Sequence, residues 1–187
     1  MISSGKLGLR FKQIEVPGFP MEGSSIEFST IFKGRAFNDV NGAGDMDHTR
    51  SGSDILVRID PGEEIHTTLQ QLADDLGFDA AAITSGIGRT RNNQYGYMNE
   101  EGVYKKRLLA APSELVSLSG NIARTESGES FTHIHCCWSD DDNHVHAGHM
   151  FESTVHVVAE IHIRVMEHAS MMRCPLDGLE LLGLEFD

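Results

Sequence analysis

The clearest structural signal in the chain is the segment VHVVAEIHIRV, which occupies residues 155–165. Apolar side chains fill every second position, and most of the positions between them are polar or charged. The apolar positions are Val155, Val157, Ala159, Ile161, Ile163 and Val165. Side chains of a β-strand alternate between the two faces of a sheet. The segment therefore predicts an antiparallel strand with one face on the core.

Well ahead of this strand, residues 55–59 (ILVRI) predict another strand that leads into a helix. Asp60 suits the N-cap, Pro61 suits the first helical position, and Glu63 completes a variant of the capping box. Gly77 stands where a left-handed C-cap is expected. The segment predicts one amphipathic helix, whose apolar stripe is formed by Ile65, Leu69, Leu72 and Leu76.

Several further strands are expected. Residues 80–84 are small and apolar, and they end in Ser85-Gly86-Ile87-Gly88, which predicts a tight turn. More strands are predicted at residues 95–98, 114–122 and 131–138. A strand, a helix and then several strands indicate an α+β fold, with a mostly antiparallel sheet packed with one or two helices.

The first 53 residues differ from the rest of the chain. They are rich in Gly and Ser and show no sustained helical period, although alternation over residues 26–32 predicts one edge strand. We therefore expect a loop-rich N-terminal extension over residues 1–53 and an α+β domain over residues 54–187.

Composition narrows the class of protein. The 187 residues are 40% hydrophobic, which is ordinary for a soluble globular protein. No stretch approaches the ~20 apolar residues of a transmembrane helix. No apolar run follows the first residues as in a signal peptide, and three cysteines do not suggest a disulfide framework. We expect a cytoplasmic protein without a membrane partner.

The formal net charge of −13 argues against DNA binding by the chain alone, because affinity for DNA comes mainly from cationic groups. Two short basic patches exist, Arg89 with Arg91 and KKR at residues 105–107. Both are more typical of solvated faces than of phosphate sites.

The histidines carry the strongest chemical signal. Five of the ten lie between residues 133 and 149. His133 and His135 occupy alternate positions of a predicted strand, so both imidazoles face the same way with Cα atoms ~6.5–7 Å apart. An acidic loop at residues 139–143 predicts a hairpin that returns a second strand beside the first. The two ring nitrogens can therefore bind one ion, with a third ligand from His144, His146 or His149.

Spacing alone does not choose among these three. A single His-x-His pair is more often two ordinary surface or interface histidines, and the three later histidines favour a metal site. Three imidazoles with one open position are typical of catalytic zinc, although iron, nickel, copper and cobalt also accept imidazole. His156 and His162 are expected only to line a half-buried face.

Blocks of sequence over residues 54–180 resemble the PPC domain, the "plant and prokaryote conserved" domain. The block at residues 114–122 is the most specific, being similar to the family's ELLSLSG run. In order, the blocks are RIDPGEEI (58–65), AITSGIG (82–88), ELVSLSGNI (114–122), HIH (133–135) and AGHM (147–150).

This resemblance implies an α+β fold, assembled as a homotrimer, with a divalent metal ion, often zinc. The matching histidines are His133, His135 and His149, so the resemblance favours His149 as the third ligand. Ala147 and Met150 depart from the family's Gly and Leu but leave the imidazole in place. In plants the domain follows Arg-Gly-Arg-Pro AT-hooks. This chain has only KGRA at residues 33–36, so autonomous DNA binding is not expected.

Two functions follow from such a site. A metal-dependent enzyme would act on a small molecule, with Glu160 or Glu114 as the nearest candidates for a general base by sequence. Each of these is more typical of a sheet or interface charge. Alternatively, the ion is structural or sensory, and the trimer is a regulatory module that binds a protein or a DNA-associated partner.

Overall fold

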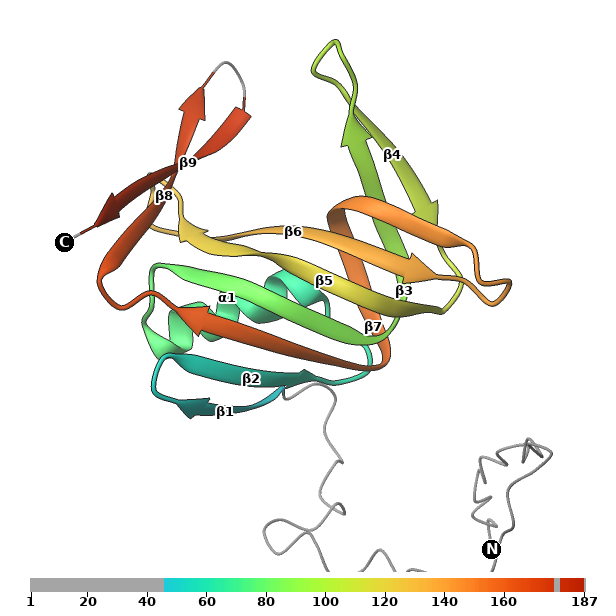
Figure 1. Cartoon of the computed structure of the whole chain (residues 1–187), viewed down its shortest axis with the longest axis horizontal. Coiled ribbons are helices and arrows are strands. Elements are labelled where there is room, and N and C mark those ends of the chain that lie inside the picture. The colour runs from blue at the N-terminus through green and yellow to red at the C-terminus, as the bar shows by residue number, and fades with distance from the viewer. Residues whose placement is uncertain (1–45, 177–178, 187) are drawn as a thin grey trace, which may run out of the picture. The chain divides into compact units, whose positions relative to one another are not determined.

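The computed structural model describes residues 46–176 and 179–186, which belong to the unit Val40–Asp187. One helix and nine strands occur in this part (Figure 1). The edge strand predicted at residues 26–32 lies outside the described residues. The elements in chain order are β1 (Asp47–Ser51), β2 (Asp54–Ile59), α1 (Ile65–Leu76), β3 (Ala81–Met98), β4 (Tyr104–Leu109), β5 (Ser113–Arg124), β6 (Ser130–Ser139), β7 (Val145–Val165), β8 (Ala169–Leu176) and β9 (Leu179–Phe186).

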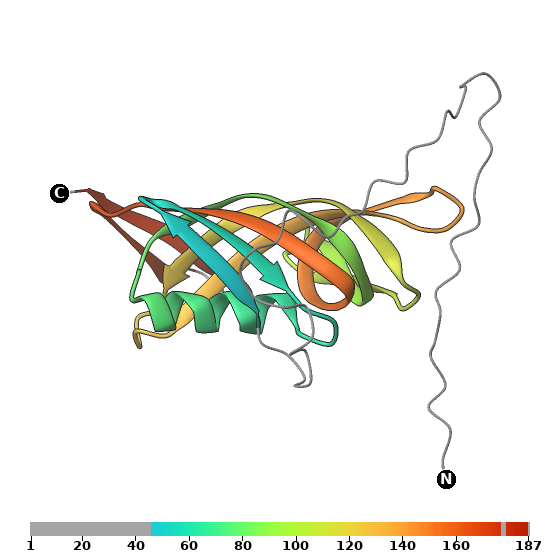
Figure 2. The ribbon, with the colours of Figure 1, turned by 90° about the horizontal axis from the view of Figure 1, so that it is seen from below.

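The strands form one sheet in the order β1-β2-β7-β3-β5-β8-β9. β4 extends β3, and β6 pairs with both β5 and β7. All pairings are antiparallel except a single parallel pair between β5 and β8. Figure 2 shows α1 lying along one face of the sheet, where its apolar stripe meets the core. The expected mostly antiparallel sheet with one helix is confirmed.

The helix begins later than the sequence predicted. Gly62 donates its N–H to the carbonyl of Val155, and Val155 donates back to the carbonyl of Glu63, both at 2.9 Å. These bonds commit residues 62 and 63 to β7, so the backbone cannot turn into a helix at Pro61. Instead Glu64 is the N-cap, and its carboxylate accepts the Thr67 N–H. The C-cap at Gly77 is confirmed, with φ 67° and ψ 43°.

The predicted turn at residues 85–88 is wrong, because β3 continues through it for 18 residues. Its glycines permit close approach between strands. A Cβ at Gly88 would lie 2.1 Å from the carbonyl oxygen of Val158 on β7. The predicted strand at residues 155–165 is likewise part of the longer β7. Val157 was expected on the core face of this strand, but its side chain is exposed. A register shift between β3 and β7 breaks the regular pairing there.

The first described strand, β1 (Asp47–Ser51), lies ahead of residue 54, where the sequence predicted the domain to begin. It pairs with β2 along its whole length. No helix in the described part of the chain is long and apolar enough to cross a membrane.

Candidate metal centre

Three histidines from two strands meet on one face of the sheet. His133 and His135 lie on β6 and alternate with buried residues such as Ile134, so their imidazoles point away from the core. His149 lies on β7 directly opposite His135 in register. One ligand atom of each imidazole lies within 4.8 Å of the others. We call His133, His135 and His149 the histidine cluster.

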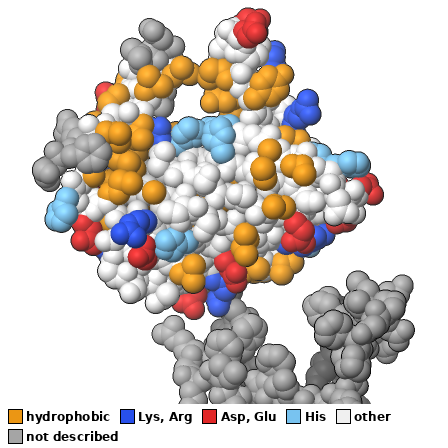
Figure 3. Space-filling model, viewed as in Figure 1, with side chains coloured by type: hydrophobic (Ala, Val, Ile, Leu, Met, Phe, Trp, Pro, Cys, Tyr) orange, Lys and Arg blue, Asp and Glu red, His pale blue; other side chains and the backbone are white. Residues whose placement is uncertain are grey.

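The rings are nearly equidistant. Ring centroids are 5.0 Å apart for His133 and His149, 5.2 Å for His133 and His135, and 5.3 Å for His135 and His149. Two hairpins, β3–β4 and β8–β9, rise on either side of this region (Figure 1). Figure 3 shows histidine side chains gathered at the base of the hollow between them.

Two glycines let the strands approach closely at the cluster. A Cβ at Gly120 would lie 2.0 Å from the carbonyl oxygen of His133. A Cβ at Gly148 would lie 2.5 Å from the carbonyl oxygen of Gly96 on β3. Since real side chains never come so near to a backbone oxygen, any larger residue at either position would displace a strand that carries the cluster.

The environment keeps two of the imidazoles neutral. Burial lowers the pKa of His149 to about 4, helped by the charges of His133, His135, His66 and Lys106. Burial also lowers the pKa of His133, with Arg173 as the next cause. Neutral imidazole is the form that binds a metal ion. At neutral pH these two side chains therefore need not release a proton to do so.

One atom of the cluster is left without a hydrogen-bond partner in the described part of the chain. Nδ1 of His149 is buried and has no hydrogen-bond partner among the described residues. A buried polar atom left in this state costs ~1–3 kcal/mol. Three neutral imidazole nitrogens at this separation are the donor set that zinc and other first-row divalent ions accept. The residues present therefore fit a divalent metal ion.

His66 of α1 links the two strands of the cluster from the core side. Its Nδ1 lies 2.7 Å from Thr132 Oγ1 and its Nε2 lies 3.2 Å from the carbonyl oxygen of Met150. A carbonyl oxygen only accepts, so Nε2–H donates to Met150 and Nδ1 accepts from the Thr132 hydroxyl. Gln70 donates to the same hydroxyl oxygen at 3.1 Å. Thr132 precedes His133 and Met150 follows His149 in the sequence. This network therefore holds the backbone positions from which both imidazoles project.

No sequence pattern assigned a role to His66. His66 reaches β6 and β7 through tertiary contacts: Thr132 is 66 positions away in the sequence and Met150 is 84 positions away. The only local signal was a polar residue beside the apolar stripe of a predicted helix.

An aromatic wall borders the cluster on the side of β4. The Tyr104 ring lies 5.1 Å from the His149 ring, and the Phe151 ring lies 4.7 Å from it. Lys106 places its Nζ 4.1 Å from the centroid of Phe151. The basic patch at residues 105–107 therefore contributes one cation to the border of the cluster.

The other two candidates for the third ligand lie elsewhere. Asp140 Oδ2 accepts from His146 Nε2 at 2.9 Å, and Asp140 Oδ1 accepts the backbone N–H of His144 at 2.8 Å. The hydrogen bond from His146 is the main reason that the pKa of Asp140 falls to about 2. Asp140, Asp142 and His144 also have ligand atoms within 4.8 Å of one another. We call these three residues the turn cluster, since they close the β6–β7 hairpin.

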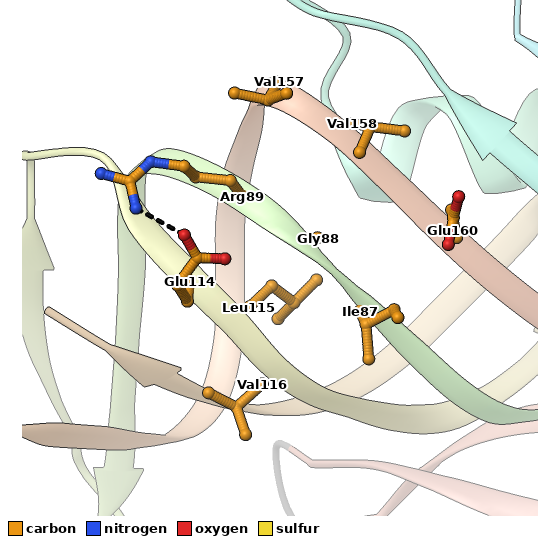
Figure 4. A pocket seen from close by; sticks show the side chains of 9 residues that line it. All are labelled: Ile87, Gly88, Arg89, Glu114, Leu115, Val116, Val157, Val158 and Glu160. Atoms are coloured by element: carbon orange, nitrogen blue, oxygen red, sulfur yellow. Dashed lines mark hydrogen bonds and ion pairs between the residues drawn. The ribbon is translucent and has the colours of Figure 1, made fainter. Parts of the chain in front are cut away.

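The remaining histidines and acids named from the sequence lie apart from the cluster. His156 and His162 are half-buried, as expected, and His162 Nδ1 lies 2.6 Å from Thr84 Oγ1. Glu114 and Glu160 line an open groove formed by β3, β5 and β7 (Figure 4). There Arg89 Nη1 donates to Glu114 Oε1 at 2.6 Å. Neither acid belongs to the histidine cluster, so neither is placed as its general base.

Comparison with known proteins identifies the fold. The model of the Plants and Prokaryotes Conserved (PCC) domain matches residues 46–168. A plant- and prokaryote-conserved (PPC) protein from Pyrococcus horikoshii is 30% identical, with a TM-score of 0.64; the match covers 76% of this chain and 96% of that one. No curated protein matches the sequence significantly.

Two further solved structures are similar. A metal-containing protein from Archaeoglobus fulgidus is 26% identical over 77% of this chain and 99% of that one, with a TM-score of 0.62. A protein from Bacteroides thetaiotaomicron, named as a candidate DNA-binding protein, is 20% identical over 75% of this chain and 97% of that one, with a TM-score of 0.67; this likeness shows the fold alone. With a family model matched over most of its length, the chain belongs to the Plants and Prokaryotes Conserved domain family.

Proposed function

We propose that the chain is a homotrimeric zinc-binding protein whose histidine cluster acts on a small molecule. The observation that carries this proposal is the group of three imidazoles itself. Among the described residues, no fourth side-chain ligand joins the group. A four-coordinate ion held by three histidines keeps one position for water or substrate, which is the pattern of catalytic zinc sites. When bound, the ion would act as a Lewis acid and lower the pKa of a bound water.

The chain's own residues would hold and orient this ion. His133, His135 and His149 supply the nitrogens, and His66 fixes the strand segments that carry them. Burial excludes water from one side of His149, which strengthens electrostatic interactions at the centre. The metal-containing relative from Archaeoglobus fulgidus supports a metal in this fold.

A second function is favoured by what surrounds the cluster. Every charge that shifts the pKa of His133 or His149 comes from a cationic type of residue. A carboxylate that could serve as a general base is therefore not among the groups that shift these two pKa values. A regulatory or binding module with a structural or sensory ion would need no such base. In that case a further ligand from a partner chain would close the fourth position.

The X-ray absorption spectrum of the zinc-loaded protein separates the two functions. The catalytic proposal predicts three imidazole nitrogens and one oxygen at ~2.0–2.1 Å from zinc. A fourth ligand from the protein would contradict it and support a structural ion. Metal analysis of the same sample tests the identity of the ion, because imidazole also suits iron, nickel, copper and cobalt.

The open groove in Figure 4 supports the proposed homotrimer. Ile87, Val116 and Val157 line it, and their side chains are 54%, 55% and 53% exposed. They lie on the face of the sheet opposite the core. Such a gathering of exposed apolar side chains is typical of an interaction surface. We propose that copies of this chain cover it, in the cytoplasm, without DNA as an obligatory partner.

Light scattering of the Val157→Asp variant tests the trimer. A charge at the centre of a buried apolar contact should shift the mass from three chains toward one. Val145→Asp is the control, since Val145 is 72% exposed at the β6–β7 turn and should leave the trimer intact. A wild-type mass of one chain, or a trimeric Val157→Asp variant, would contradict the proposal.

A further inference from the structure

We propose that the histidine cluster takes a small anionic molecule, and that Lys106 holds its carboxylate or phosphate group. This inference rests on the proposed metal site and adds the chemical class of its ligand. It also gives a role to the basic patch on β4, which the proposed function leaves unused.

The first argument is the register of four neighbouring strands. Lys106 on β4 pairs with Gly96 on β3, and Gly96 pairs with His149 on β7. His149 in turn pairs with His135 on β6. Neighbouring strands are ~4.8 Å apart, so Lys106 and His149 stand about 10 Å apart across a residue with no side chain. The ammonium group and the imidazoles therefore border one space.

The second argument is that Lys106 is held on this side of its strand. Its Nζ lies 4.1 Å from the Phe151 centroid, and the Phe151 ring lies 4.7 Å from the ring of His149. Tyr104, two residues earlier on the same face of β4, packs against both rings. A cation over an aromatic face is attracted by the ring quadrupole. This contact keeps the ammonium near the cluster while leaving its three hydrogen-bond donors available to a ligand.

The third argument is charge. Lys106 takes part in none of the ion pairs found among the described residues. On the opposite side of the cluster, Arg173 of β8 lies 4.9 Å from the Phe131 ring and donates to Asn121, the register partner of His133. Cations thus border the cluster on both sides, in a chain of net charge −13. Such a local field favours an anion where the rest of the surface repels it.

The aromatic wall adds a second requirement. Tyr104 and Phe151 present ring faces and edges beside His149, at right angles to each other. A planar apolar group on the ligand would pack there while its anionic group meets Lys106. Small aromatic anions are therefore suitable probes of the site.

Calorimetric titration with benzoate, phenyl phosphate and the neutral benzyl alcohol tests the proposal. The samples are the zinc-loaded wild-type protein and the Lys106→Gln and Lys105→Gln variants, each with its zinc content measured first. Lys105 is the matched control because it carries the same charge on the opposite face of β4. We expect Lys106→Gln to weaken binding of an anion about tenfold, and Lys105→Gln to weaken it less than about twofold. Preference for benzoate or phenyl phosphate distinguishes a carboxylate ligand from a phosphate ligand.

Three results would overturn the proposal: no binding of either anion to the wild-type protein, equal effects of the two lysine variants, or benzyl alcohol binding as tightly as benzoate. Zinc content separates this failure from failure of the proposed function. If the wild-type protein takes up no zinc, the metal proposal fails. The same titrations on the metal-free protein then decide the anion site by itself.

Discussion

The histidine cluster offers three imidazole nitrogens and the turn cluster offers two carboxylates and one imidazole, and the two clusters also differ in what those atoms already bind. In both, three ligand atoms lie within 4.8 Å of one another. In the turn cluster, Asp140 accepts hydrogen bonds from the backbone of Asp142 and His144 and from the His146 ring. In the histidine cluster, Nδ1 of His149 is buried without a partner among the described residues.

This difference teaches that proximity alone does not define a metal site. The turn cluster is a set of donors and acceptors that satisfy one another and shape a hairpin. Each neutral imidazole of the histidine cluster has one nitrogen that can accept a hydrogen bond or bind an ion, and the cluster is bordered by aromatic and cationic side chains. Such a group is stabilised by a cation that enters it, so the two clusters should respond differently to metal and to pH.

The largest expected effect is on zinc affinity, when replacement of His149 in the histidine cluster is compared with replacement of His146 beside the turn cluster. His149→Ala should weaken zinc binding by roughly a hundredfold, because a binding free energy of order 10 kcal/mol is shared among few ligands. His146→Ala removes a histidine three residues away and should leave affinity within about twofold, since His146 bonds to Asp140 and Tyr95. Competition with a chromophoric chelator measures both. Equal losses would mean that the two regions share one ion.

A smaller effect is expected from the support beneath the histidine cluster. His66→Ala removes the bonds to Thr132 and Met150, and should weaken zinc binding about tenfold, as loss of outer-shell partners does in other metal sites. His162→Ala is the control, because it also removes a half-buried histidine bonded to a threonine. If His162→Ala weakens zinc binding as much as His66→Ala, a general loss of stability is the cause.

The smallest effect concerns pH, where both clusters should lose stability on acidification but in different pH windows. The pKa of His149 is lowered from 6.5 to about 4, so the unfolded chain binds the proton first. Stability of the metal-free protein should therefore fall as pH drops from 6.5 toward 4. The pKa of Asp140 is lowered from 3.8 to about 2, so its stabilisation is present above 3.8 and is lost only below that value.

Urea midpoints of the chelator-treated protein between pH 7 and pH 4.5 measure this contrast. The His149→Asn variant should show a shallower fall than the wild-type protein, and Asp140→Asn should leave the slope in this window unchanged. A wild-type midpoint that rises on acidification would contradict the assigned sign.

Local patterns in the sequence predicted the elements more reliably than their ends. Strands were correctly predicted at residues 55–59, 114–122 and 131–138, and the helical stripe located α1 with its cap at Gly77. The helix start was misplaced because Gly62 bonds to Val155, a partner far away in sequence. The glycines at residues 86 and 88 were read as a turn because close packing against β7 leaves no local trace.

The site shows the same division. Strand spacing placed His133 and His135 on one face, but the third histidine depends on the register of β6 against β7. Only the family resemblance favoured His149 from the sequence. The roles of His66 and Lys106 could not be predicted from the sequence, since each lies near the cluster through a contact with another element. The groove that contains Glu114 and Glu160 could not be predicted either, because three different strands form it.

The most direct test compares the zinc content of two triple variants after loading and gel filtration. One carries His133→Ala, His135→Ala and His149→Ala; the other carries Asp140→Ala, Asp142→Ala and His144→Ala. We predict about one zinc per chain in the wild-type protein and in the turn variant, and none in the histidine variant. Unchanged zinc in a folded histidine variant, or zinc lost only from the turn variant, would contradict a metal centre at the histidine cluster.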